Sequence, residues 1–211
     1  MFFFFRNTGQ PTFFSAMVLL FMPFLAAALL GQGPVPKSRP AAAPAPAAKP
    51  AAAAPVVWAA GRPLVVADFQ SRPGPSDRLA ALTSAEIKSG VACRDFVFSA
   101  SVQATFDPAT SWIRDPKNAT PALLRHEQLH FDLTEVYARR LRQKLVVFQA
   151  KANCNKLQPA FDNLTKPVYD EWNREQNRYD AETNHGLNPA RQAYWEQQTK
   201  LKLDQLQAFA Q

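Results

Sequence analysis

The stretch from Thr120 to about Ala152 most constrains the fold, because it contains no glycine and only one proline, Pro121, close to its start. Threonine followed by proline is a typical helix start. The threonine hydroxyl can cap the first turn, and proline at the first helical position needs no N–H group. The sequence therefore predicts one long helix over this stretch.

Shorter elements are expected on both sides of this helix. Two more helices are predicted at about 158–183 and 189–209, and Pro167 should kink or start the first of them. Residues 64–69 are a candidate for a short strand, and 96–106 alternate apolar and polar residues as a half-buried strand does. Strands first and helices afterwards predict an α+β fold, with a small N-terminal sheet and long helices behind it.

Residues 1–30 have the pattern of an export signal. One positive charge, Arg6, precedes an apolar stretch over 13–30 that only Ser15 and Pro23 interrupt, and three alanines at 26–28 offer a cleavage site. A cleaved signal peptide and an uncleaved membrane anchor both fit this length. In either case we expect the rest of the chain to be periplasmic or secreted, with possible attachment to the inner membrane.

Residues 31–55 are mostly proline and alanine, which cannot bury a core and favour an extended spacer. The folded domain is expected over 56–211. The whole chain has a net charge of +7, but four basic residues and no acidic ones precede Val56, which leaves 20 basic and 17 acidic residues in the domain. With no run of five lysines or arginines, nothing supports nucleic-acid binding.

The chain has two cysteines, Cys93 and Cys154, in a compartment that permits oxidation. Only one intramolecular pairing is possible, and a bridge closing so long a loop would stabilise the fold by about 4 kcal/mol. The alternatives are two unrelated buried thiols or two metal ligands. The wide spacing and the absence of a C-x-x-C motif favour the disulfide.

The sequence His126-Glu127-Gln128-Leu129-His130 on the long helix is the centre of the functional argument. Two histidines four residues apart lie on one helix face, about 40° apart, so both imidazoles can reach one metal ion. Glu127 would lie beside the ion and could accept a proton from a water molecule that zinc activates. The histidines also share an apolar stripe of the helix, so two buried core histidines are the competing interpretation.

The third histidine of the chain, His185, completes the number of protein ligands that a catalytic zinc usually has. Asp180 or Glu182 could then orient one of the ligand imidazoles. Glu182 itself and Glu135 are the alternative third ligands, but Glu135 lies about 180° around the helix from His126. We expect the metal ligands to be His126, His130 and His185.

Two long blocks of the sequence resemble the bacterial domain-of-unknown-function family 922, whose members are described as predicted secreted zinc-dependent proteases. The first block is Leu123-Leu124-Arg125-His126-Glu127-Gln128-Leu129-His130-Phe131-Asp132, followed by Glu135, Tyr137, Ala138 and Arg139. The second contains Tyr179-Asp180, Thr183, His185-Gly186, Gln192 and Trp195. Shorter matches are Asp68-Phe69-Gln70, Ala104-Thr105-Phe106-Asp107-Pro108 and Ser111-Trp112.

The resemblance implies a zincin-like fold in which the helix with the active site packs under a small sheet. It also implies zinc at His126 and His130, Glu127 as acid and base, and His185 as third ligand. Leu129 departs from the family pattern, where a small residue is expected; it points away from the metal, so the departure concerns packing.

The predicted function is that of an exported zinc metalloprotease, whose substrates are proteins or peptides of the cell envelope. Tyr179 or Tyr194 could stabilise the oxyanion. The alternative is a non-catalytic envelope module with a structural metal site, which would bind a partner through aromatic residues of the polar tail after residue 158. Those aromatic residues are Trp172, Tyr179, Tyr194 and Trp195, and burial in the helix core is the other interpretation of them.

Overall fold

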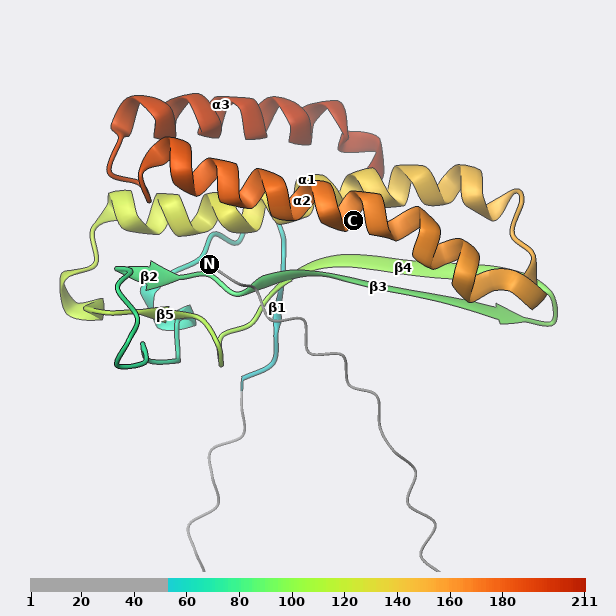
Figure 1. Cartoon of the computed structure of the whole chain (residues 1–211), viewed down its shortest axis with the longest axis horizontal. Helices are drawn as coiled ribbons and strands as arrows, with labels where there is room; N and C mark the ends of the chain where they lie inside the picture. The colour runs from blue at the N-terminus through green and yellow to red at the C-terminus, as the bar shows by residue number, and fades with distance from the viewer. Residues whose placement is uncertain (1–52) are drawn as a thin grey trace, which may run out of the picture. The chain divides into compact units, whose positions relative to one another are not determined.

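Helices cover one face of a small antiparallel sheet in the computed structural model of the chain, which describes residues 53–211 (Figure 1). The predicted α+β class is confirmed. The helices α1 and α2 pack on the sheet, and α3 packs on these two helices. The strands are β1 Val56–Val57, β2 Ala81–Leu82, β3 Ala85–Arg94, β4 Val97–Phe106 and β5 Trp112–Ile113, and the helices are α1 Pro121–Gln149, α2 Leu157–Thr183 and α3 Pro189–Gln205.

The long hairpin of β3 and β4 is the main part of the sheet. Its two strands pair over their whole length, from Ala85 opposite Phe106 to Arg94 opposite Val97. The connecting residues Asp95 and Phe96 both have positive φ, as two-residue hairpin turns often require. β1 pairs with the other edge of β4, and β2 pairs separately with β5. The strand predicted at 96–106 is thus confirmed as β4, whereas β3 was not predicted.

The strand predicted at 64–69 is wrong, because the chain forms a turn of 3₁₀ helix at Val66–Asp68. The Asp68 carboxylate accepts a hydrogen bond from the Val65 backbone N–H (2.8 Å) and pairs with the Arg62 guanidinium at 2.7 Å. A local bond from an aspartate to the backbone competes with strand pairing. Burial would raise the pKa of Asp68, but these partners outweigh burial and lower it.

The three predicted helices are confirmed to within a few residues of their ends. The Thr120 hydroxyl caps α1 by accepting from the Leu123 N–H at 3.2 Å. Pro167 lies inside α2, so the helix does not start there. Within residues 53–211, no helix is long and apolar enough to cross a membrane. The signal or anchor expected at 1–30 lies outside the described residues, as does most of the expected linker at 31–55.

The core lies between α1 and the sheet, where Phe106 of β4 and Phe131 of α1 are both completely buried. A disulfide joins Cys93 and Cys154, as predicted, with 5.8 Å between the Cα atoms. It ties the end of the long hairpin to the connection between α1 and α2, at the right of Figure 1. The opposite end of α1 lies far from this disulfide along the helix, and that end carries the histidines.

Candidate metal centre

Three side chains from α1 and α2 converge on one point. The Nε2 atoms of His126 and His130 lie 3.2 Å and 3.0 Å from Oδ1 of Asp180. One ligand atom from each of the three residues lies within 4.8 Å of the other two. His126 is almost fully buried, while His130 and Asp180 keep some exposure. The spacing of the two histidines on one helix face therefore brings their rings together, as the sequence predicted.

Each imidazole contacts a glutamine through Nδ1, the ring nitrogen that faces away from Asp180. Nδ1 of His126 faces Oε1 of Gln192 at 3.3 Å, and Nδ1 of His130 faces Oε1 of Gln176 at 2.6 Å. The orientation of the Gln192 amide is fixed because its nitrogen donates to the carboxylate of Glu196 at 3.0 Å. A carbonyl oxygen can only accept, so Nδ1 must carry the hydrogen in both rings.

The Gln176 amide is fixed in the same way. Its nitrogen donates to the backbone oxygen of His130 (2.9 Å) and to the hydroxyl of Thr134 (3.2 Å). The amide oxygen therefore has to face the His130 ring. Such outer hydrogen bonds select the tautomer of metal-binding histidines and keep the ring nitrogen that binds the metal free.

This arrangement leaves two Nε2 lone pairs and one carboxylate oxygen facing each other. Without a proton or a cation between them, the Asp180 oxygen and the two Nε2 acceptors that lie 3.0 Å and 3.2 Å from it repel one another. Four ligands at zinc distances are separated from each other by roughly 3.3–3.4 Å in tetrahedral geometry. The donor set and its spacing therefore fit a small divalent cation.

The charges of the cluster agree with this fit. Burial lowers the pKa of the His130 imidazole, but its interactions with Asp180 and with the Glu127 carboxylate outweigh burial and raise the pKa. Burial raises the pKa of Asp180, but its interactions with the His126 and His130 rings outweigh burial and lower the pKa well below its usual range. Asp180 is therefore a carboxylate that needs a positive charge beside it.

Tyr179 and Gly186 fix the positions of the rings. The Tyr179 ring stacks on His126, with 4.8 Å between centroids, and meets His130 edge to face at 4.9 Å. Its hydroxyl donates to Oε1 of Gln192 at 2.8 Å. Gly186 follows α2 with φ of +79°, and a Cβ atom there would lie 3.0 Å from Cγ of His126. Only glycine allows the backbone to pass so close to this ring.

Glu127 lies next to the cluster and is itself held in place. It is 4% exposed, and its Oε2 accepts a hydrogen bond from the Thr83 hydroxyl at 2.8 Å. Thr83 lies in the short connection between β2 and β3. Thr83, which lies between two strands, thus fixes the orientation of the Glu127 carboxylate on α1 without neutralising its charge.

The remaining predicted residues occupy less central positions. Nδ1 of His185 lies 3.5 Å from Oδ1 of Asp180, and its side chain is half exposed at the rim of the cluster. Glu182 faces away, toward the Arg191 guanidinium and the Trp195 indole N–H. Glu135 is buried on another face of α1, where it pairs with Arg139 at 2.8 Å.

The two tyrosines considered for the oxyanion are not equivalent. Tyr179 is fully buried, and its hydroxyl is engaged by Gln192 and by the backbone oxygen of His126. Tyr194 is partly exposed on α3, under the Arg191 guanidinium at 4.4 Å. Tyr179 therefore has the role of a support for the histidines.

Sequence reasoning missed Gln176 and Thr83, and it did not predict that Asp180 itself is a candidate metal ligand. Gln192 belongs to the block that carried the family resemblance, but without a role. A signal for Gln176 was its spacing, because it precedes Asp180 by four residues and so lies on the same face of α2. Thr83 left no such signal, since its contact with Glu127 joins segments 44 residues apart.

A recess of about 350 Å³ opens beside His185 and Gly186. The start of α1 and the end of β5 form its other walls, with Leu123, Ile113 and Leu187 among the apolar residues. The cluster therefore has a neighbouring cavity large enough to hold an amino-acid side chain.

The fold and this cluster define an α+β protein with a candidate divalent metal site between two helices, α1 and α2. The model of one family, described as bacterial protein of unknown function (DUF922), matches residues 75–186, which include α1, the cluster and Gly186. The chain belongs to this family. No curated protein and no solved structure matches the chain significantly.

Proposed function

We propose that the protein is a zinc-dependent hydrolase of amide bonds that acts on proteins or peptides of the cell envelope. The observation that carries the proposal is the convergence of two histidine Nε2 atoms and the Asp180 carboxylate at 3.0–3.2 Å, with Glu127 beside them. A zincin-like identity and a location outside the cytoplasm belong to the same proposal. The disulfide between Cys93 and Cys154 supports an oxidising compartment.

His126, His130 and Asp180 would hold the zinc ion, because their ligand atoms already lie at suitable distances. His185 is the ligand expected from the sequence, and its position 3.5 Å from Asp180 keeps it within reach of the same centre. Both sets of three ligands leave a coordination position open, as catalytic zinc requires. The zinc content of Asp180 and His185 variants distinguishes the two ligand sets.

The bound ion would act as a Lewis acid toward water and toward the scissile carbonyl. Glu127 would accept the proton of the attacking water and later pass it to the leaving amine. Thr83 would keep this carboxylate oriented through its 2.8 Å hydrogen bond. Gln176 and Gln192 would keep both imidazoles in the tautomer that binds metal through Nε2.

Two histidines and one carboxylate also bind iron in some oxygenases. Glu127 favours hydrolysis, because a carboxylate beside the metal provides the general base that hydrolysis requires. The recess at His185 and Gly186 supports a peptide substrate with an apolar side chain next to the cleaved bond, since Leu123, Ile113 and Leu187 line it.

The test is the variant Glu127→Gln, assayed for zinc content and for cleavage of an unstructured protein such as casein. Glu127→Gln should retain zinc and lose cleavage, because the amide cannot accept the proton. The matched control is Glu171→Gln, which changes an exposed glutamate of α2 that pairs with Arg140 at 2.7 Å. Cleavage by Glu127→Gln at the wild-type rate would contradict the proposal. Zinc binding without cleavage in the wild type would favour the non-catalytic envelope module.

A further inference from the structure

We infer that the end of the domain with the disulfide binds a membrane surface that contains anionic lipids. This end consists of the turn between β3 and β4, the last turns of α1 and the connection to α2, at the right of Figure 1. We call it the tip and define it as residues 91–98 and 144–157. The histidines of the candidate metal centre lie toward the other end of α1, so the inference does not depend on the proposed function.

Exposed apolar side chains gather at the tip. It holds four of the nine large apolar side chains that are exposed within residues 53–211, namely Phe96, Val97, Val146 and Val147. The other five are distributed over the rest of the domain. Single exposed apolar residues are ordinary on a soluble protein, but a group of them at one end marks an interaction surface.

Phe96 contributes little to the stability of the free domain. It is 88% exposed, so its ring packs against almost nothing. Its φ of +62° lies in the left-handed region, which a bulky side chain disfavours. Tight hairpin turns usually have glycine or asparagine where φ is positive. The ring therefore burdens the turn without packing on the fold, which favours a role in contact with something outside the domain.

The hairpin turn and the end of α1 are held together as one body. The Phe98 ring on β4 meets the Phe148 ring on α1 edge to face, with 5.5 Å between centroids. The disulfide between Cys93 and Cys154 joins the same two parts of the chain. Each of the two rings is preceded along the chain by an exposed valine. The apolar side chains of the tip therefore have fixed positions at one end of the domain.

The charge of the tip indicates the chemistry of its partner. Its four cationic residues, all exposed, are Arg94, Lys144, Lys151 and Lys156. Its one acidic residue is Asp95, which leaves the tip with a net charge of +3. The 20 basic and 17 acidic residues of 56–211 give the whole domain the same net charge, so the remainder is neutral overall. The positive charge of the domain is thus concentrated around the exposed apolar residues.

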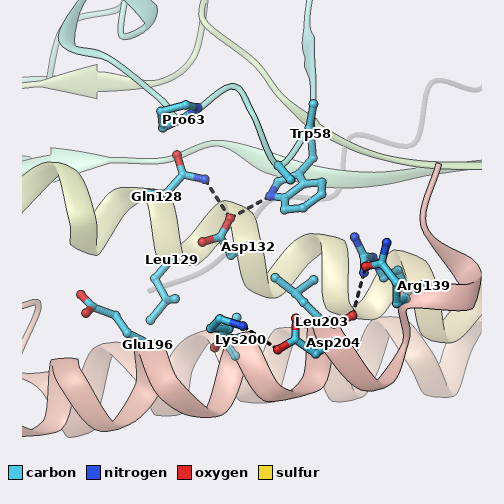
Figure 2. Close-up of a pocket in the computed structure, with 14 residues that line it drawn as sticks. Trp58, Pro63, Gln128, Leu129, Asp132, Arg139, Glu196, Lys200, Leu203 and Asp204 are labelled. Atoms are coloured by element: carbon cyan, nitrogen blue, oxygen red, sulfur yellow. Dashed lines mark hydrogen bonds and ion pairs between the residues drawn. The ribbon is translucent and has the colours of Figure 1, made fainter.

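These cations are also free of ion pairs. No carboxylate within residues 53–211 lies at ion-pair distance from any of the four. Outside the tip, every lysine of this range except Lys117 pairs with a carboxylate, as Lys200 does with Asp204 at 2.6 Å (Figure 2). Unpaired lysines can turn toward lipid phosphates while the apolar residues between them enter the interface.

The shape of the tip favours a lipid surface over an acidic protein. Phe96 lies on the turn at the far end of the long hairpin (Figure 1). A protein would need a cavity that matches this projecting turn, whereas lipid headgroups separate around an inserted ring. The anchor predicted at 1–30 would keep the domain near such a surface, although the inference does not require it.

The experiment is cosedimentation of residues 53–211 with lipid vesicles. This part folds on its own, because it contains the whole described core and the disulfide. It also lacks the apolar stretch 13–30, which would bind lipid by itself. We expect binding to phosphatidylcholine vesicles with about one third phosphatidylglycerol, and little binding to phosphatidylcholine alone. Most of the binding should be lost in about 0.5 M salt, because salt screens the surface charge.

Phe96→Gly tests the apolar contribution. It should lower the partition coefficient about tenfold or more, because the inserted ring is lost. The free domain should be at least as stable as the wild type, since glycine suits a φ of +62°. Denaturation of the variant therefore separates a loss of binding from a loss of folding. Leu187→Ser is the matched control, because Leu187 is 78% exposed outside the tip, and it should bind as the wild type does.

A double variant tests the charge. Lys144→Ser combined with Lys151→Ser should lower the partition coefficient more than tenfold, at about fivefold for each lysine near an anionic surface. Lys117→Ser combined with Lys200→Ser removes the same charge from exposed positions outside the tip, and it should leave binding unchanged.

Equal binding to vesicles with and without phosphatidylglycerol, or no binding to either, would overturn the inference. Wild-type binding by both Phe96→Gly and the Lys144→Ser, Lys151→Ser double variant would do the same. Binding of soluble polyglutamate without any binding of vesicles would also overturn it, and would assign the tip to an acidic protein partner.

Discussion

Replacing Gly186 by alanine is expected to weaken metal binding through the His126 ring, although Gly186 itself has no side chain to bind metal. The added Cβ would lie 3.0 Å from Cγ and 3.2 Å from Nδ1 of His126. Ordinary carbon contacts lie at 3.5–4.0 Å, so the ring or the backbone has to move by roughly 0.5 Å. A functional constellation tolerates displacements of only about this size.

The magnitude follows from two separate costs. Alanine at φ of +79° costs about 1–2 kcal/mol of folding free energy, which corresponds to roughly 2–8 °C in the melting temperature of a domain of this size. Displacing a metal-binding ring from its outer hydrogen bond typically lowers metal affinity about 10- to 100-fold. The first cost should appear in the metal-free protein, and the second should appear only in zinc binding.

The assay combines chelator competition for zinc affinity with chemical denaturation of the metal-free protein. Gly61→Ala is the matched control, because a Cβ there meets no atom within 4 Å, and it should change neither quantity appreciably. A Gly186→Ala protein with wild-type zinc affinity would refute the reasoning, since the ring would then tolerate the contact.

Three further predictions concern the supports of the fold and the site. Gln176→Ala should lower zinc affinity about 10- to 100-fold by releasing the His130 ring. Gln158→Ala, at the exposed start of α2, should leave the affinity unchanged, and chelator competition measures both. Reducing the disulfide between Cys93 and Cys154 should lower the free energy of unfolding by about 4 kcal/mol, since it closes a loop of 61 residues; unchanged denaturation midpoints would contradict this. Glu175 has a lowered pKa because Lys202 and Tyr137 outweigh the effect of burial. Its contribution to stability should be present above about pH 4.3, the pKa of an unperturbed glutamate, and should be lost as the pH falls through the lower folded-state pKa. In denaturation measured from pH 7 to pH 3, Glu175→Gln should therefore lose less stability than the wild type. An equally steep loss of stability in the variant would contradict this role of Glu175.

The sequence predicted the elements whose signals are local. Thr120 and Pro121 set the start of α1, and the spacing of His126 and His130 placed both rings on one face of it. The alternation of residues over 96–106 predicted β4 because the hydrophobic pattern of that strand is regular.

The errors arose where a local interaction overrides the pattern or where the partner is distant. Asp68 turns the apolar segment 64–69 into a 3₁₀ turn by binding the Val65 N–H and Arg62. β3 was not predicted because Lys88, Ser89 and Gly90 interrupt the alternation of apolar and polar residues. Hydrogen bonding to β4 along its whole length holds this segment as a strand despite its sequence. Thr83 became visible only in the structure, because its contact with Glu127 depends on how the sheet side meets α1.

The position of Asp180 likewise depends on how two helices pack, which the sequence pattern does not predict. The sequence suggested that its carboxylate would orient a ligand, whereas its Oδ1 itself contacts Nε2 of both imidazoles. Which residue of 179–185 reaches the histidines depends on the rotation of α2 against α1, and the spacing along the chain does not fix that rotation.

The most direct test of the account is the zinc content of the purified domain, residues 53–211, by elemental analysis after zinc supplementation. The account predicts about one zinc ion per chain, which should be lost in His126→Ala and in Asp180→Ala. His185→Ala should retain zinc if Asp180 is the third ligand, and should lose it if His185 is. A folded wild-type domain without any bound metal would contradict the account, and it would make the histidines part of the core.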